Sequence, residues 1–218
     1  TEGASSVFVV DIDNDGDVDI LFGSYADDTI PLYKNDGAAD PSWTAVTIAT
    51  AADGARSVFA ADMDNDGDMD IVSASSGDDA IAWYENTTST AFTPTYTANT
   101  ISTSADGASV VFAADMDKDG DIDVLSASWN GDNISWYQND GNLNFTSNTI
   151  STDVNQPSSI FATDLDGDGD MDVLSSAHAG DEIAWYENNG SQSFTKYSIT
   201  TSTNGARSVF AIDLDRDG

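Results

Sequence analysis

Aspartates recur at every second position of a nine-residue segment that appears four times in this chain. The first copy is Asp11-Ile12-Asp13-Asn14-Asp15-Gly16-Asp17-Val18-Asp19, and the others start at Asp62, Asp115 and Asp164. A fifth copy starts at Asp213 and continues to the last residue. Each close pair of carboxylates costs about 1 kcal/mol in water and about 4 kcal/mol at an effective dielectric constant of 20. Such loops therefore indicate a bound counter-ion.

A hard cation with oxygen ligands would remove this repulsion. We expect the aspartates at positions 1, 3 and 5 to face the ion, the glycine at position 6 to permit the turn, position 7 to offer its carbonyl, and position 9 to close the shell. Calcium accepts such a flexible set of about six to eight oxygens, whereas magnesium requires a tight octahedron. The sequence predicts calcium as the cofactor, with four sites and the fifth copy lacking a closing carboxylate. The predicted metal-site residues are Asp11, Asp13, Asp15, Asp17, Asp19, Asp62, Asp64, Asp66, Asp68, Asp70, Asp115, Asp117, Asp119, Asp121, Asp123, Asp164, Asp166, Asp168, Asp170 and Asp172.

Two other interpretations of these loops were weighed. An EF-hand opens with the same pattern but needs a glutamate at position 12 and flanking helices. Position 12 is instead Phe22, Ser73, Ser126 and Ser175, and strand-like residues follow. A merely acidic, solvated turn would leave the repulsion uncompensated. Both explain the loops less well than calcium.

The segments around each loop predict short strands. In the second unit, residues 56–61 lead into the loop, residues 70–75 follow it, and the aromatic residues 81–85 come after a Gly-Asp-Asp turn. Residues 92–101 then alternate as a half-exposed outer strand should. Asn-Asp-Gly or Asn-Asn-Gly separates the last two strands in the other units, and such pairs indicate hairpins in which both residues tolerate positive φ.

Four strands joined by turns and repeated about every 50 residues define a blade, so the predicted fold class is all-β, a β-propeller of four-stranded blades. We expect one propeller domain with four full repeats and the start of a fifth, and interpret it as part of a larger ring. Trp-Tyr pairs at residues 83–84, 136–137 and 185–186 are expected to lie in the core between blades. The predicted blades are residues 3–53, 54–106, 107–155 and 156–204, followed by 205–218.

Charge and composition restrict the partners. The 218 residues include 39 acidic and 6 basic residues, for a formal charge of −33. Nucleic acid and anionic membranes would be repelled. No apolar stretch is long enough for a spanning helix, so we expect no membrane insertion. Cysteine is absent, which excludes disulfides and thiolate chemistry.

The loops, preceded by Ser-Val-Phe-Ala-Ala-Asp and followed by Ile-Val-Ser-Ala-Ser and Trp-Tyr-Glu-Asn, resemble the FG-GAP/VCBS repeat family, which includes the propeller of integrin α subunits and many exported bacterial proteins. The resemblance covers essentially the whole chain. It implies calcium in the loop between the first two strands of a blade and a secreted or cell-surface, bacterial location. The family usually has seven blades, so we expect open blade edges here and self-association through them.

The function expected is adhesion or recognition of a glycan or protein ligand. The alternative is the propeller of a calcium-dependent polysaccharide lyase or glycosidase. We expect no catalytic centre, because His178 is the only histidine and no nucleophile elbow or zinc motif is present. The sixth residue after each closing aspartate varies, and this variation has two explanations: the turn residues are unconstrained, or they form a ligand face opposite the calcium loops. Its predicted ligand-binding residues are Tyr25, Arg56, Trp129, His178 and Arg207.

Overall fold

The structure is a computed structural model that describes residues 3–87 and 95–214. Its described residues form strands in four sheets and contain no helix. The strands are β1 (Ala4–Val10), β2 (Asp19–Ser24), β3 (Ile30–Asn35), β4 (Trp43–Ala49), β5 (Ala55–Ala61), β6 (Asp70–Ser75), β7 (Ala80–Asn86), β8 (Tyr96–Ser102), β9 (Ala108–Ala114), β10 (Asp123–Ser128), β11 (Asn133–Asn139), β12 (Phe145–Ser151), β13 (Pro157–Thr163), β14 (Asp172–Ala177), β15 (Glu182–Asn188) and β16 (Phe194–Thr200).

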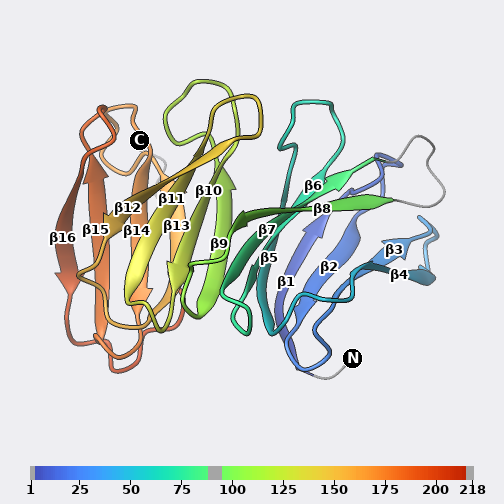
Figure 1. Cartoon of the computed structure of the whole chain (residues 1–218), viewed down its shortest axis with the longest axis horizontal. Coiled ribbons are helices and arrows are strands. Elements are labelled where there is room, and N and C mark those ends of the chain that lie inside the picture. Colours follow the sequence, from blue (N-terminus) through green and yellow to red (C-terminus); the bar gives the residue numbers. More distant parts are fainter. Residues whose placement is uncertain (1–2, 88–94, 215–218) are drawn as a thin grey trace.

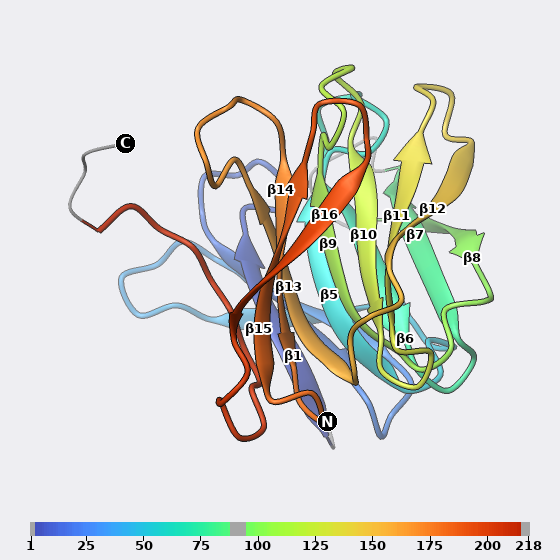
Figure 2. The same cartoon turned by 90° about the vertical axis from the view of Figure 1, so that its left-hand side faces the viewer.

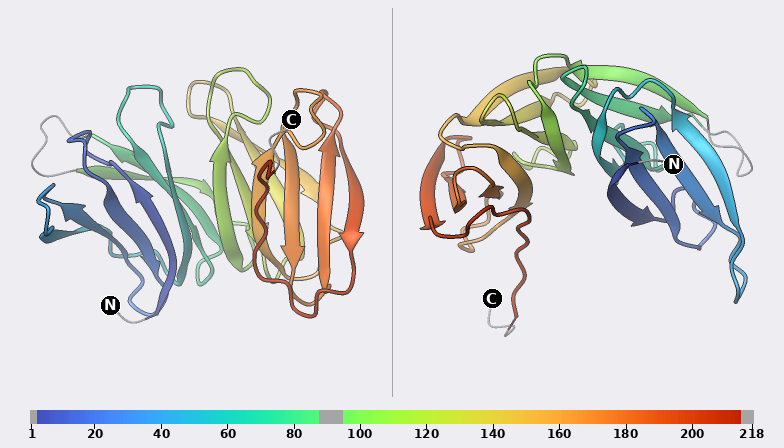
Figure 3. Two further views of the ribbon diagram at one scale, coloured as in Figure 1. Left: turned by 180° about the vertical axis from the view of Figure 1, so that it is seen from behind. Right: turned by 90° about the horizontal axis from the view of Figure 1, so that it is seen from below.

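Each sheet consists of four antiparallel strands in the order of the sequence. The aspartate loops join the first strand to the second, and Figure 1 shows them at the end of the molecule away from the N-terminus. The four sheets follow one another along an arc (Figure 3). The structure therefore confirms an all-β fold made of four consecutive propeller blades.

The second strand of the second, third and fourth blades is buried on both faces. Every residue of β6, β10 and β14 is buried, which matches their nearly continuous apolar sequences. Three apolar clusters fill the spaces between successive blades. Trp136 and Tyr186, which are 1% exposed, belong to the cluster between the third and fourth blades, so the expected core position of the Trp-Tyr pairs is confirmed for them.

A phenylalanine ladder runs along the first strands of the blades. Successive ring centroids lie 4.6, 4.8, 5.4 and 4.8 Å apart, which is the separation of attractive aromatic pairs. The ladder consists of Phe8, Phe59, Phe112, Phe161 and Phe210. Its last member lies beyond β16, in a segment that lines β13 without forming a strand (Figure 2).

That segment, residues 205–214, also repeats the hydrogen bonds between blades. Ser158 Oγ donates to the carbonyl of Ala206 at 2.7 Å, and the Val209 amide donates to Ser159 Oγ at 3.3 Å. The rest of the fifth loop, residues 215–218, lies outside the described residues. The start of a fifth blade stays a prediction.

The connections between the third and fourth strands differ from the expected hairpins. Gly141 has a φ of 73°, but the second residue with positive φ in this connection is Leu143, not Asp140. The Asp140 carboxylate instead accepts the amides of Asn142 and Asn144. A tight turn with positive φ at both Asp and Gly was therefore the wrong prediction, because the aspartate side chain closes a longer loop.

An aspartate in the turn between the second and third strands fastens each blade to the next. Asp79 has a φ of 57° and accepts the amide of Gly107, at the start of the following blade, at 2.7 Å. Asp28, Asp132 and Asp181 make the equivalent bond, with lengths of 2.9, 2.8 and 2.6 Å. Sequence reasoning missed this role, although the aspartate recurs at the spacing of the metal loops.

Replacing Asp79 with alanine should lower the free energy of unfolding by about 1–3 kcal/mol, because the Gly107 amide loses a charged acceptor. Asp79→Asn is the matched control, since asparagine tolerates positive φ and keeps an acceptor oxygen. We expect it to lose less than half as much in urea unfolding. Equal losses would show that the carboxylate charge, not the hydrogen bond, carries the effect.

Candidate metal centres and a cavity at the opposite end

Backbone amides fold each loop around its own carboxylates. In the second loop, Asp62 accepts the amides of Asp66 at 3.1 Å and Gly67 at 3.0 Å. Asp66 in turn accepts the amide of Asp68 at 2.9 Å. Gly67 has a φ of 96°, and the glycine at position 6 has a φ of 95–98° in all four loops, a conformation that other residues adopt at a cost.

The folded loops bring three carboxylates together in each blade. One oxygen from each lies within 4.8 Å of the other two, which is close enough for the three to share one ion. The groups are Asp11, Asp13 and Asp15; Asp62, Asp64 and Asp66; Asp115, Asp117 and Asp123; and Asp164, Asp166 and Asp172. These four groups could hold a metal ion.

Two buried oxygens show that the groups fit a cation. Asp13 Oδ1 and Asp115 Oδ1 are shielded from solvent and have no hydrogen-bond partner among the described residues. A buried carboxylate oxygen without a partner carries a large desolvation cost. A cation coordinated by these oxygens would remove that cost.

The aspartate at position 9 connects the loop to the blade. Asp123 accepts the amide of Met116 inside the loop at 3.0 Å and that of Asn139, at the end of β11, at 2.7 Å. Asp19, Asp70 and Asp172 do the same in their blades. The structure thus gives position 9 a second role, and in the third and fourth loops its carboxylate also belongs to the metal group.

Burial raises the pKa of three of the closing carboxyl groups. The pKa of Asp70 is raised to about 6 and that of Asp123 to about 7, although the hydrogen bonds that each accepts from backbone amides lower it in part. Burial also raises the pKa of Asp19, and the pKa values of Asp64 and Asp117 at position 3. In these five carboxyl groups, desolvation thus outweighs the hydrogen bonds.

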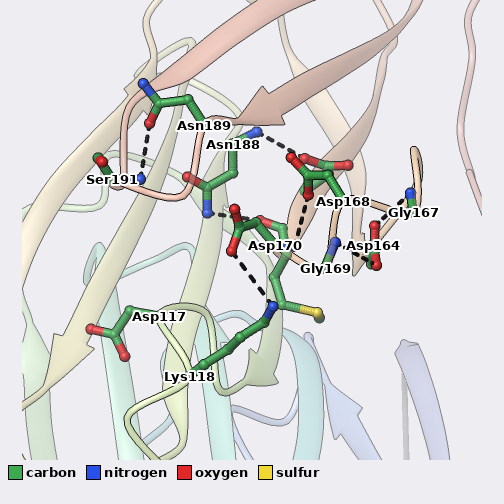
Figure 4. Close-up of polar contacts among 12 residues, drawn as sticks. Asp117, Lys118, Asp164, Gly167, Asp168, Gly169, Asp170, Asn188, Asn189 and Ser191 are labelled. Atoms are coloured by element: carbon green, nitrogen blue, oxygen red, sulfur yellow. Dashed lines mark hydrogen bonds and ion pairs between the residues drawn. The ribbon is translucent and has the colours of Figure 1, made fainter.

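The carboxylates at position 7 lie outside the groups of three. Asp68 and Asp121 accept the side-chain amides of Asn14 and Asn65 from the preceding loop at 3.3 and 3.0 Å. Figure 4 shows the third such contact, in which Lys118 Nζ lies 3.5 Å from Asp170 Oδ1. Position 7, including Asp17, therefore contributes no carboxylate to the candidate groups, and Asp68, Asp121 and Asp170 instead join neighbouring loops.

The four groups of three aspartates differ in the side chain that lies next to them. This side chain belongs to the residue before the Asn that ends each third strand. In the first blade this residue is Lys34, which pairs with Asp13. In the third blade it is Gln138, which donates to Asp117. In the second blade Glu85 adds a nearby negative charge to Asp64. Sequence reasoning missed this difference, for which the signal is the middle position of the Tyr-x-Asn that recurs in all four blades.

At the other end of the blades, the variable turn residues occupy equivalent backbone positions. The backbone amide of each donates a hydrogen bond to the carbonyl of the residue directly before the first strand of a blade. Tyr25 donates to Gly3 at 2.9 Å, Ser76 to Gly54 at 3.1 Å and Trp129 to Gly107 at 2.9 Å. His178 makes the corresponding bond to Gln156 at 2.9 Å.

A cavity of about 340 Å³ lies at this end. Of the predicted ligand residues, Tyr25, Arg56, Trp129 and Arg207 line it, whereas His178 does not. His178 instead packs against Trp129, with ring centroids 5.3 Å apart. The remaining lining residues, which were not predicted, are Ser76, Gly107, Ser109 and Asn130.

The blades and their acidic loops together define a β-propeller with repeated candidate cation sites. The family model of the FG-GAP-like repeat matches residues 11–73, 64–126 and 115–175. These matches span most of the chain, which therefore belongs to the FG-GAP-like repeat family. No curated protein matches the chain significantly.

Solved structures share the fold at low sequence identity. A putative phosphatase from Bacteroides thetaiotaomicron has 11% identity and a TM-score of 0.61 over 89% of this chain and 48% of its own. A putative 6-phosphogluconolactonase from Bacteroides uniformis has 14% identity and a TM-score of 0.60 over 93% and 61%. An exo-β-1,3-galactanase from Phanerochaete chrysosporium has 13% identity and a TM-score of 0.52 over 91% and 50%. The chain thus spans about half to three-fifths of these proteins.

The described residues include no helix that is long and apolar enough to cross a membrane.

The raised pKa values predict how the metal-free protein responds to pH. The folded chain holds protons on Asp70 and Asp123 more tightly than the unfolded chain, whose carboxyls titrate near 3.8. The stability that these groups contribute is therefore complete below about pH 4 and lost as the pH rises through about 6 to 7. In chelator, the free energy of unfolding should fall from pH 5 to pH 8, by up to about 1.4 kcal/mol per pH unit and group, and the urea midpoint should fall with it.

Asp123→Asn tests whether the buried carboxyl causes this slope. The variant lacks the titrating group, so its midpoint should change less between pH 6 and pH 8 than that of the parent protein. A parent midpoint that rises over this range, or an unchanged slope in the variant, would contradict the assignment.

Proposed function

We propose that this chain is a calcium-binding β-propeller module of a secreted or cell-surface protein, and that it recognises a glycan or protein ligand. The observation that carries the proposal is that each of the four loops brings three aspartates together. In two of these groups, a buried carboxylate oxygen has no hydrogen-bond partner among the described residues. Membership of the FG-GAP-like repeat family supports it.

The donor set favours calcium over other divalent ions. All candidate ligands are carboxylate oxygens, which suit hard cations, and the chain offers no cysteine and a single histidine for softer metals. The groups differ in which positions they use, since the first two contain position 5 and the last two contain position 9. Such variation suits the flexible shell of calcium better than the fixed octahedron of magnesium.

When bound, calcium supplies charge neutralisation at loops that are otherwise self-repelling. Hydrogen bonds from backbone amides order the aspartates of the loop without the ion. The aspartate at position 9 starts the second strand, and its hydrogen bonds connect the loop to the end of the third strand.

The cavity opposite the loops supports recognition rather than catalysis. Its wall, as formed by the described residues, contains two arginines and two aromatic rings but no carboxylate. A glycoside hydrolase needs a pair of carboxyl groups at its bond-breaking site. The likeness to the galactanase is a likeness of fold at 13% identity, so we assign the chain no hydrolytic activity.

Calcium should raise the melting temperature, because an ion that binds only the folded chain stabilises it by mass action. At tenfold excess over a dissociation constant of about 10⁻⁴ to 10⁻³ M, each site should contribute about 1.4 kcal/mol. Calorimetric titration should give four ions per chain, and magnesium should stabilise less. A melting temperature that chelator leaves unchanged would refute calcium binding.

Lys34→Gln should strengthen calcium binding at the first loop, because Lys34 pairs with Asp13 there. Glutamine is the residue that the third blade has at this position. Removing one adjacent charge is worth about 1–4 kcal/mol, so the weakest calorimetric site should tighten about tenfold. Lys118→Gln is the charge-matched control, since Lys118 contacts Asp170 outside the groups of three. Equal gains in both variants would indicate a general charge effect.

A further inference from the structure

Among the described residues, the two arginines differ from the three lysines in what they contact. Each described lysine pairs with a carboxylate, as Lys34 does with Asp13, Lys118 with Asp170 and Lys196 with Glu182. Neither Arg56 nor Arg207 pairs with a carboxylate of the described residues, although the chain has 39 acidic residues. Both line the same cavity.

The repeat shows that these arginines replace a structural serine. The equivalent residues of the other blades are Ser5, Ser109 and Ser158. Each of these donates its hydroxyl to a carbonyl of the following blade, at 2.7, 3.2 and 2.7 Å. The arginine at this position of the second and fifth repeats lacks the serine hydroxyl that makes this bond between blades, and its side chain lines the cavity instead.

Arg56 is held in place by its neighbours within the cavity. Its Nε donates to Ser76 Oγ at 3.2 Å, and its guanidinium carbon lies 4.3 Å from the centre of the Tyr25 ring. The contact with the ring is a cation–π interaction that orders the side chain without neutralising it. The guanidinium therefore retains donors for an acceptor from outside the chain.

Trp129 supplies the cavity with an apolar surface. Its ring packs against that of His178 at an interplanar angle of 36°. Indole faces of this kind pack against the C–H face of a sugar ring, and paired arginines bind carboxylate or sulfate groups through charged hydrogen bonds.

We infer that the cavity binds an acidic sugar, a terminal unit that carries a carboxylate or a sulfate, with Arg56 and Arg207 on the anionic group and Trp129 on the ring. The inference deepens the proposed function, on which it rests, by naming the class of ligand. The volume of about 340 Å³ is at the lower end of ligand sites and matches one or two sugar units.

The net charge explains why the ligand is small. A chain with a formal charge of −33 repels a long polyanion, as it repels nucleic acid. One terminal acidic unit carries little charge to be repelled, and the cavity wall formed by the described residues offers it two guanidinium groups and no carboxylate. Salt also screens charges beyond about 8 Å. The aspartate loops lie at the other end of the blades, so their charge is distant from the cavity (Figure 1).

The test is calorimetric titration of the full chain in buffered calcium. The probes are digalacturonate, a sulfated galactose disaccharide, the methyl ester of digalacturonate, inorganic sulfate and hexaglutamate. We expect a dissociation constant at or below about 1 mM for at least one of the two acidic disaccharides, and at least tenfold weaker binding of the methyl ester, of sulfate and of the peptide. The two acidic disaccharides distinguish a carboxylate from a sulfate ligand.

Arg56→Ser restores the serine of the other blades and should weaken binding of the preferred disaccharide about tenfold or more. Lys118→Gln removes the same charge at the opposite end and should leave this binding unchanged. Arg56→Lys keeps the charge but loses the planar fork, so it should recover only part of the affinity.

The calcium response separates failure of this inference from failure of the proposed function. If calcium raises the melting temperature but neither acidic disaccharide binds at about 10 mM, the cavity is not an acidic-sugar site. The same conclusion follows if Arg56→Ser binds as the parent does, or if the peptide binds as tightly as the sugars. If calcium has no effect on the melting temperature, the proposed function itself fails, whatever the sugars do.

Discussion

The buried carboxylate at position 9 links the loop of each blade to its strands. It accepts one amide from inside the loop and another from the end of the third strand, so the loop, the second strand and the third strand meet at a single side chain. Burying a charged group is costly, as the raised pKa of Asp123 shows. The cost can be offset when the oxygens face amides on one side and a cation on the other. In the third and fourth blades, where this carboxylate also belongs to the candidate metal group, a bound cation would couple the loop to the strands.

A second set of interactions joins the blades to one another. Apolar clusters fill the spaces between sheets, the phenylalanine ladder follows the first strands, and Asp28, Asp79, Asp132 and Asp181 fasten each turn to the next blade. Each of these contacts involves neighbouring blades. Stability in such an arrangement depends on nearest-neighbour interfaces, as in other repeat architectures.

The propeller blades and aspartate groups could be predicted because both depend on local spacing. Alternating carboxylates around a glycine dictate a loop, and the period of about 50 residues dictates a blade. Contacts between residues that are distant in the sequence were not predictable in this way. The pairing of Lys34 with Asp13 brings a third strand against a loop 21 residues earlier, and the bond from Asp79 to Gly107 crosses between sheets. The sequence predicted a ligand face but not the cavity in it, because the cavity walls combine residues as far apart as Tyr25 and Arg207.

The same backbone hydrogen bond recurs at Tyr25, Ser76, Trp129 and His178. The position of the side chain in the turn is therefore set by the backbone, whichever residue type stands there. The backbone amide makes this hydrogen bond whichever side chain is present, and Ser76 adds a second bond from its hydroxyl to the same Gly54 carbonyl at 3.3 Å. Exchange of one ring for another therefore leaves the blade intact and alters only the surface that it displays. Repeats of this kind can acquire new specificities through single substitutions, with little compensation required elsewhere in the fold.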